Sequence, residues 1–202
     1  MRQRSSVIVS LFAFVACVGA MTTAQAAVEW KVSDGGNGHS YEVVAAPAGI
    51  TWQQARDAAV ARGGNLATIT CSAEDQFVYN LASQNDAAWT FHSEWGNGPW
   101  LGGFQPTGSP EPAGGWQWVT GEPWSYANWA PGTPNDDSGL EDSLHYGGIP
   151  YTLKSSQWND ISHDSLVNGY VIEFNPVPEP SSLLALLCGV GGLSGMIRRR
   201  RM

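Results

Sequence analysis

Cysteine is nearly absent from this chain of 202 residues. Cys17 and Cys188 lie in apolar runs at the two ends, so Cys71 is the only cysteine between them and the central part cannot form an internal disulfide. Its stability therefore has to come from a hydrophobic core, which the ten tryptophans between positions 30 and 158 could fill. For Cys71 the sequence favours a buried free thiol and leaves open a disulfide to a second chain.

Basic residues are also scarce away from the ends. Six of the ten lie in segments 2–4 and 198–201, and the net charge of the chain is -8. The four that remain for the central part are Lys31, Arg56, Arg62 and Lys154. Nucleic acids and anionic lipids both need clustered lysine and arginine. The sequence therefore excludes a nucleic acid partner, and it agrees with binding of a cation or of a neutral polysaccharide.

A catalytic motif is missing as well. The central part has His92, His145 and His163, and His145 follows Glu141 by four residues. No serine or cysteine, however, lies in a recognisable nucleophile elbow or dyad motif. Isolated histidines in a loop-rich domain are usually solvated or packed, so the sequence predicts that this protein is not an enzyme.

The N-terminal segment 1–26 is typical of a secretory signal peptide. Arg2 and Arg4 precede an apolar run over 7–20, and a small-residue pattern at 24–26 follows at the distance expected of a cleavage site. We expect the mature chain to begin near Ala27. The alternative is a buried N-terminal helix, but no charged residue interrupts the run.

The C-terminal segment 176–202 combines three unlike features in a fixed order. The motif Pro178-Glu179-Pro180 precedes about 15 apolar or small residues over 183–197, and four arginines follow at 198–201. A helix over the apolar run is about 22 Å long, which is short for a bilayer core of about 30 Å, yet it spans with local thinning and snorkelling arginines. The positive-inside rule places the arginines in the cytoplasm.

This tail resembles the PEP-CTERM sorting signal of Gram-negative bacteria. The resemblance implies anchoring in the inner membrane, recognition by an exosortase and cleavage near the motif. It further implies release or attachment at the cell surface, commonly alongside exopolysaccharide. A permanent tail anchor without processing stays open as the alternative.

The first part of the central segment predicts strands and a helix. Two short strands within 28–44 flank a glycine-rich turn at 34–38. Thr51 and Gln54 fit a capping box at the start of a helix that runs to about residue 62. Three side chains at helical spacing form its expected buried face: Trp52, Ala55 and Ala59.

A β-rich segment at 65–70 leads into a second predicted helix. The residues 72–75 fit a second capping box, and we expect Phe77, Val78 and Leu81 to face inward. Two helices therefore lie early in the chain.

Loop-forming residues dominate from about residue 85 to 151, with brief strand candidates at 100–102 and 116–119. A loop region that long signals function or disorder, and its density of tryptophan argues against disorder. The β-rich run 169–174 can pair with the N-terminal strand and bring the two ends of the domain together.

Eight landmarks that follow one another along 28–175 resemble a C-type lectin domain. They are Trp52-x-x-Ala55, Gly63-Gly64-Asn65-Leu66-Ala67-Thr68-Ile69, Trp100-Leu101-Gly102-Gly103, Asn128-Trp129, Thr133-Pro134-Asn135, Glu141-Asp142, Trp158-Asn159-Asp160 and Ile172-Glu173-Phe174. The resemblance implies an α+β, C-type lectin-like fold over 27–175, in which two helices and small antiparallel sheets support a long loop region. A C-terminal transmembrane helix would follow it.

The two disulfides of that family have no counterpart in this sequence. The positions of the long-range bridge match Ala59 and Ile172, and the local bridge has Ser143 in place of one cysteine and no cysteine after Asp160. Ala59 and Ile172 can fill similar space as an apolar contact. The loops lose a covalent restraint worth about 2 to 4 kcal/mol.

The resemblance implies a calcium site formed by Asn135, Glu141, Asn159 and Asp160, with a cis peptide bond before Pro134. These are the hard oxygen ligands that Ca²⁺ prefers. Vicinal sugar hydroxyls would complete the calcium shell, and the implied sugar contacts come from four residues: Thr133, Asn135, Glu141 and Asn159.

Thr133 departs from the pattern, because the sugar-binding members of the family have Glu or Gln at this position. The change leaves Glu141 and Asp160 as the formal charges, unless Asp136 or Asp137 joins them. Fewer charged ligands weaken calcium binding, toward roughly 10⁻⁴ to 10⁻³ M. The alternative is that these residues maintain only the loop shape.

Two further features of the loop region are weaker. The aromatic residues Trp124, Tyr126 and Tyr151 could stack on a pyranose ring, although the sequence favours packing for each. A second calcium site would need an acidic residue near Gln105, which is a poor substitute.

The first functional hypothesis is an exported, calcium-dependent carbohydrate-binding module that contacts polysaccharide at the cell surface or in the extracellular matrix. The second is a calcium-independent structural or adhesion module that keeps the fold and has lost the sugar site.

Overall fold

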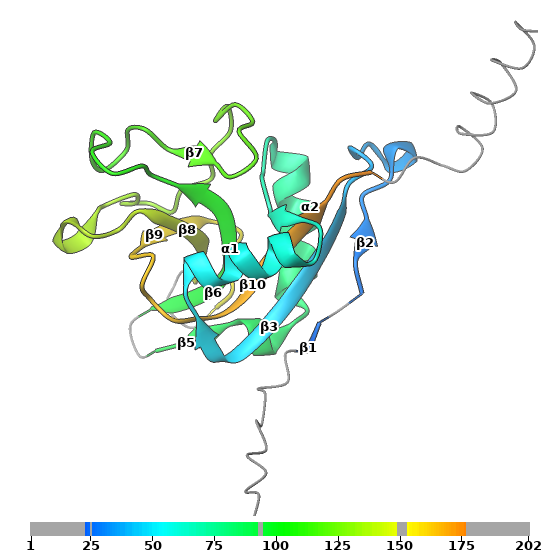
Figure 1. The fold of residues 1–202 in the computed structure, drawn as a ribbon, viewed down its shortest axis with the longest axis horizontal. Coiled ribbons are helices and arrows are strands. Elements are labelled where there is room, and N and C mark those ends of the chain that lie inside the picture. Colours follow the sequence, from blue (N-terminus) through cyan, green and yellow to red (C-terminus); the bar gives the residue numbers. More distant parts are fainter. Residues whose placement is uncertain (1–22, 25, 93–94, 149–152, 177–202) are drawn as a thin grey trace, which may run out of the picture.

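The strands of this protein form one mixed sheet in a computed structural model that describes residues 23–24, 26–92, 95–148 and 153–176 (Figure 1). Most of the predicted signal peptide, the Pro178-Glu179-Pro180 motif and the apolar run at 183–197 lie outside the described residues. Within the described part, no helix has the length and apolar character needed to cross a membrane.

The sheet has the strand order β1-β3-β10-β6-β8-β9, while β2 pairs with β3, β4 with β10, and β5 and β7 with β6. The strands are β1 (Thr23–Ala24), β2 (Val28–Glu29), β3 (Ser40–Ile50), β4 (Asn65–Leu66), β5 (Thr90–Phe91), β6 (Gly96–Phe104), β7 (Gln117–Trp118), β8 (Ser143–Gly148), β9 (Trp158–Ile161) and β10 (Val167–Phe174). All pairs are antiparallel except β10 and β6, which run parallel. The expectation of small, purely antiparallel sheets is therefore wrong, whereas the predicted pairing of the C-terminal strand with the N-terminal strand is confirmed by β3 and β10.

Helix α1 (Trp52–Ala61) begins as the sequence predicts. The Thr51 hydroxyl accepts a hydrogen bond from the Gln54 amide, and the Gln54 side chain accepts one from the Thr51 amide, so the capping box is complete. Trp52, Ala55 and Ala59 are buried, as expected. The short turn η1 (Val32–Asp34) lies between β2 and β3, where the glycine-rich turn was predicted.

Helix α2 (Ser72–Ser83) begins differently from the prediction. Its N-cap residue is Cys71, whose side chain makes no capping bond, and the Glu74 carboxylate instead accepts hydrogen bonds from the Thr70 amide (2.6 Å) and hydroxyl (2.8 Å). The second capping box is therefore wrong, because Ser72 is already helical. Cys71 is exposed, which also overturns the expectation of a buried thiol.

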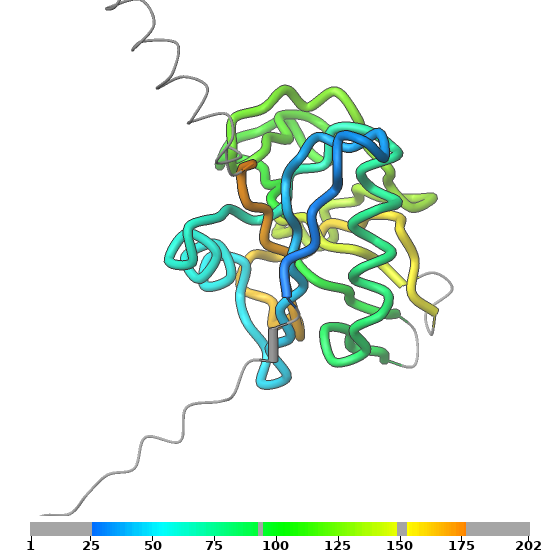
Figure 2. The backbone as a smooth tube through the Cα atoms, turned by 90° about the vertical axis from the view of Figure 1, so that its right-hand side faces the viewer, coloured from blue at the N-terminus to red at the C-terminus, as the bar shows by residue number. Residues whose placement is uncertain are grey.

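The two helices cover opposite faces of the β3 and β10 strands (Figure 2). Side chains alternate between the faces along a strand. Accordingly Val43 and Val171 pack in the core that includes α2, whereas Val44 and Ile172 pack in the core that includes α1. Ala59 and Ile172 are both fully buried in the α1 core, so apolar packing occupies the place where the family bridge would lie.

A cluster of tryptophans forms the base of the long loop region around β7. Five indole rings lie 4.5 to 6.3 Å apart between centroids: Trp116, Trp118, Trp124, Trp129 and Trp158. Such aromatic pairs each contribute about 0.5 to 1.5 kcal/mol beyond the area they bury. Packed rings therefore hold the loops that lack a covalent bridge.

Asp75 fastens the tryptophan cluster and its surroundings to α2. Its buried carboxylate accepts hydrogen bonds from Tyr126 (3.0 Å), Asn128 (2.7 Å), Tyr146 (2.9 Å) and the indole of Trp158 (3.3 Å). Burial raises the pKa of Asp75, while these four donors oppose the shift. The packing role favoured for Tyr126 is confirmed by this bond and by its contact with Trp158.

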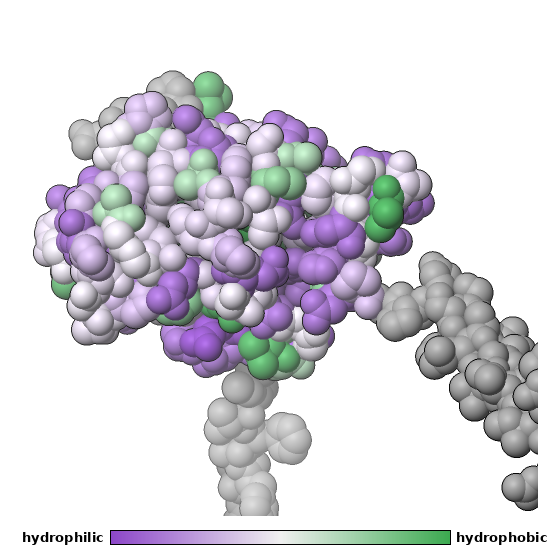
Figure 3. Space-filling view, turned by 90° about the horizontal axis from the view of Figure 1, so that it is seen from above, coloured by the Kyte–Doolittle hydropathy of each residue, from purple (hydrophilic) through white to green (hydrophobic). Residues whose placement is uncertain are grey.

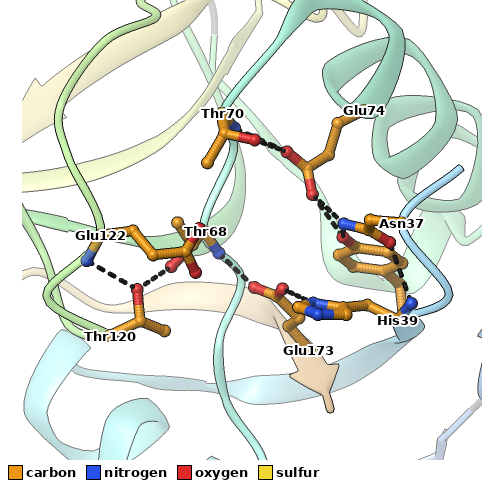
Figure 4. Close-up of polar contacts among 9 residues, drawn as sticks. Asn37, His39, Thr68, Thr70, Glu74, Thr120, Glu122 and Glu173 are labelled. Carbon is orange, nitrogen blue, oxygen red and sulfur yellow. Dashed lines mark hydrogen bonds and ion pairs between the residues drawn. The ribbon is translucent and has the colours of Figure 1, made fainter. Parts of the chain in front are cut away.

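A second buried network joins the N-terminal segment to α2 and β10 (Figure 4). Tyr41 (2.5 Å) and Asn37 (2.8 Å) donate to the same Glu74 oxygen. Nearby, the Glu173 carboxylate pairs with the His39 ring and accepts a hydrogen bond from the Thr68 amide at 2.8 Å. Both carboxylates are thus satisfied inside the protein, as buried charges require.

The face of the molecule in Figure 3 is mostly hydrophilic or neutral, with apolar residues in small separate patches.

Candidate functional site

Strand β9 and the loop after the cis peptide bond Thr133-Pro134 lie against each other, and the predicted cis bond is confirmed. The Asp160 carboxylate accepts hydrogen bonds from the backbone amides of Asn135 (3.0 Å) and Asp136 (2.9 Å). Asp160 is fully buried, and burial raises its pKa despite these amides. Asp160 therefore fixes the loop in which Asn135 lies.

Glu141 closes the other side of this loop. Its carboxylate accepts a hydrogen bond from the Asp137 amide (2.8 Å), and its own amide donates to the Asp136 carboxylate (3.1 Å). Burial, with a smaller contribution from the nearby carboxylates of Asp160, Asp137 and Asp136, raises the pKa of Glu141 to about 7. These four acidic residues give the loop a negative charge, which would attract a cation.

Asn159 and Thr133 have different surroundings from the two acids. The Asn159 amide nitrogen donates to the Asp160 carbonyl (2.7 Å) and lies 3.2 Å from His145 Nε2. The Thr133 hydroxyl lies 3.0 Å from the carbonyls of both Ala130 and Trp158. Its hydrogen is therefore used within the protein, and Thr133 ties the loop to β9.

The donor set fits a weak oxygen-ligand site. Side-chain oxygens of Glu141, Asn159, Asn135 and Asp160 are of the kind that Ca²⁺ prefers, and a carboxylate that accepts amide hydrogen bonds keeps further lone pairs. Among the described residues, however, no three His, Cys, Asp or Glu side chains are grouped as a metal site. Any ion here would depend on amide and backbone oxygens.

A cavity of about 770 Å³ opens beside the loop. Three of the predicted residues line it: Thr133, Glu141 and Asn159. Asn135 and Asp160 do not line it; the Asn135 amide, in the loop, donates to the Asp160 carboxylate of β9, and this bond holds the loop in shape. The structure thus brings the predicted residues into one neighbourhood but divides them between the cavity wall and its support.

The remaining candidates lie elsewhere. Gln105 uses its amide nitrogen to hold the carbonyls of Pro112 (3.2 Å) and Gly114 (2.7 Å), so it serves the loop. Trp124 packs in the tryptophan cluster, and Tyr151 lies outside the described residues. His145 is buried against Trp100, and His163 pairs with the Asp142 carboxylate at 2.7 Å.

Sequence reasoning missed the far end of the cavity. His92, Trp95, Asn97 and the glycines at 147–148 also line it. None belongs to a recognisable motif. Trp95 is 49% exposed and is the one tryptophan of the ten on the open surface, but a sequence pattern does not separate an exposed tryptophan from a buried one.

Comparisons with known proteins agree with this architecture. The family profile described as the Lectin C-type domain matches residues 48–171. Ladderlectin of Oncorhynchus mykiss is 29% identical over 112 residues, which are 55% of this chain and 51% of ladderlectin, so the match spans about half of that relative.

Solved structures show the same fold. The cow carbohydrate-recognition domain of CD23, solved in the presence of a GlcNAc2Man3 oligosaccharide, has a TM-score of 0.52 at 24% identity. The match covers 68% of this chain and 88% of the CD23 domain. A calcium-independent type II antifreeze protein has a TM-score of 0.54 at 19% identity. The match covers 76% of this chain and 98% of the antifreeze protein. The chain therefore belongs to the C-type lectin domain family, whose members are binding modules and not enzymes.

Proposed function

We propose that this domain is a calcium-dependent carbohydrate-binding module. The observation that carries the proposal is that Thr133, Glu141 and Asn159 line a single cavity beside a loop rich in carboxylates. The expectation that the protein is not an enzyme follows from its family and agrees with this proposal. The glycan seen with the cow CD23 domain gives the ligand class.

Four residues would hold the ion. Glu141 and Asn159 would offer side-chain oxygens from the cavity wall, while Asn135 would offer one from the loop and Asp160 one from β9. A bound Ca²⁺ would supply open coordination positions for two sugar hydroxyls. Glu141 can accept a hydrogen bond from such a hydroxyl. Because the Thr133 hydroxyl is used by two carbonyls, we expect it to position the loop more than to contact the sugar.

Calorimetric titration of the purified domain with calcium tests the first step. We expect weak binding that Glu141→Gln abolishes, because the variant keeps the shape of the side chain and loses the charge. A glycan array with and without chelator tests the second step, and the glycan signal should disappear with chelator. Flat traces in both assays would end the proposal.

A calcium-independent binding or structural module is the second candidate. It is favoured by the hydrogen bonds within the loop, since the carboxylates of Asp160 and Glu141 already accept from the backbone amides of residues 135–137 without an ion. The antifreeze protein of the same fold is described as calcium-independent. Thermal unfolding unchanged by chelator, together with ligand binding unchanged by chelator, would select this candidate.

We further propose export, and anchoring through the segment 176–202 before processing at the cell surface. The support is the sequence alone: the signal-like segment 1–26 and the Pro178-Glu179-Pro180 motif with its apolar and basic tail. Mass spectrometry of the mature chain tests this directly. Termini near Ala27 and near the motif are expected, whereas an intact tail would point to a permanent anchor.

A further inference from the structure

We infer that the cavity binds a chain of several neutral sugar units, with one unit at Glu141 and Asn159 and another stacked on Trp95. This inference rests on the proposed function and adds to it the length and charge of the ligand. Three observations carry it: the floor of the cavity, its two ends and the charge of its lining.

The floor of the cavity is built from neighbouring strands with little side-chain bulk. In β6 and β8, Gly96 pairs with Gly148 and Asn97 pairs with Gly147. A side chain at Gly147 would meet nothing closer than 3.4 Å, so no steric need of the fold excludes a larger residue there. Gly147 and Gly148 both line the cavity without a side chain, and this part of the wall along β8 is the path that we assign to the sugar chain.

The two ends of this path are far enough apart for more than one sugar unit. At one end, Asn159 of β9 pairs with His145 of β8. Gly148 lies three residues after His145 in β8 and pairs with Gly96 of β6. Three residues of extended strand span about 10 Å. Trp95 immediately precedes Gly96, so the path leads from Asn159 at one end to Trp95 at the other.

Trp95 has the geometry of a stacking platform. About half of its surface is exposed, although the other nine tryptophans of the chain are buried or partly buried. The His92 ring lies against it, with ring centroids 4.8 Å apart, and supports it from one side. A half-exposed indole ring can stack on the apolar face of a pyranose.

The charge of the lining selects a neutral ligand. Asp137 and Glu141 line the cavity, and among the residues that the structure describes no lysine or arginine does. Amides and hydroxyls supply the remaining polar contacts, among them Asn97 and Ser162. A bound Ca²⁺ would offset only two of the four carboxylate charges gathered here, those of Glu141, Asp160, Asp137 and Asp136. Uronic acid or sulfated chains would still meet net negative charge, so we expect polymers of neutral hexose or N-acetylhexosamine.

Calorimetry with a length series tests the inference. The probes are manno- and gluco-oligosaccharides of one to five units, with tetragalacturonate as the anionic probe, all in calcium. We expect affinity to rise with length up to about four units and tetragalacturonate to bind more weakly than either neutral tetrasaccharide. Trp95→Ala should lower tetrasaccharide affinity roughly 3- to 10-fold and leave monosaccharide affinity unchanged.

Two variants sharpen the test. Trp95→Phe keeps an aromatic ring and should restore most of the affinity, while Val60→Ala, on the exposed surface of α1, should have no effect.

The outcomes separate this inference from the function on which it rests. If no probe of any length binds, both fail together. If sugars bind at Glu141 but affinity does not change with length, or Trp95→Ala equals the wild type, the extended site is overturned and the proposed function stands. Tighter binding of tetragalacturonate would overturn the choice of a neutral ligand.

Discussion

At the scale of single residues, Thr133 explains most about this site. The family resemblance marks it as the departure from a sugar-binding pattern, and the structure shows what its hydroxyl does instead, which is to bond the carbonyls of Ala130 and Trp158. The shorter, neutral side chain of Thr133 therefore holds the loop to β9, and the cavity lacks the carboxylate that a glutamate at this position would add.

Thr133→Glu should raise calcium affinity about tenfold or more, because it adds a charged oxygen ligand to a site that has few. The same change should lower the free energy of unfolding by about 1 kcal/mol, because it removes the hydroxyl tie. Calcium calorimetry and denaturant unfolding measure the two effects. Thr133→Val is the matched control and should show the stability loss alone; equal calcium binding by all three proteins would contradict the prediction.

His145 predicts a pH dependence of stability. Burial lowers its pKa to about 4, so the native state holds the neutral ring. The unfolded chain has the ordinary pKa of about 6.5 and takes up the proton first, so this contribution to stability is complete above pH 6.5 and is lost as the pH falls toward 4. Between pH 7.5 and 4.5, we expect the wild type to lose about 2 to 3 kcal/mol more than His145→Gln.

Denaturant unfolding at the two pH values, with chelator present, measures this difference. The comparison with His145→Gln cancels the other buried acids, such as Glu173, whose raised pKa acts in the opposite direction. An equal loss of unfolding free energy in the two proteins would contradict the prediction, because it would mean that protonation of His145 does not destabilise the native state.

At the scale of elements, packing replaces the covalent bridges of the family. Ala59 of α1 and Ile172 of β10 are buried in one core, and the loop region rests on the tryptophan cluster. A disulfide introduced as Ala59→Cys with Ile172→Cys, in a Cys71→Ser background, should raise the free energy of unfolding by about 2 to 4 kcal/mol.

The reduced form of the same double variant is its control and should be less stable than the starting protein, because it loses the methyl groups of Ile172. Unfolding with and without reductant measures the gain. Failure of the two cysteines to oxidise would mean that α1 and β10 are not aligned as the family bridge requires.

The elements show why part of this structure was predictable from sequence. Local signals were reliable where one side chain acts on its own neighbours: Thr51 and Gln54 set the start of α1, and the apolar spacing of Trp52, Ala55 and Ala59 set its buried face. The start of α2 was misjudged because Glu74 bonds back to Thr70, a choice that depends on the buried network around Tyr41. The same sequence pattern fits both arrangements.

The site was predictable to the same limited extent. The cis bond before Pro134 and the cavity residues Glu141 and Asn159 followed from the family landmarks. The far end at Trp95 did not, because its exposure results from the pairing of β5 with β6, which no local motif encodes.

At the scale of the whole molecule, we expect the fold to tolerate the predicted removal of its N-terminal segment. Strand β1 pairs with β3 only at Val44 and Ala45, and the predicted cleavage before Ala27 removes it. Strand β3 remains paired with β10 along most of its length. A chain over 27–176 should unfold cooperatively, within about 1 kcal/mol of one over 23–176. Denaturant curves of the two chains measure this, and a non-cooperative curve for the shorter chain would show that β1 is needed.

The pairing of β3 with β10 also decides how the molecule is oriented. Phe174, the last residue of β10, pairs with Ser40 of β3. The C-terminal end of β10 lies away from β8 and β9 (Figure 1). A stalk attached after residue 176 would thus leave the domain on the side away from β8 and β9. An anchor at this end of β10, as proposed above, would leave free the cavity at the other end of the strand, where Ser165 and Leu166 line it.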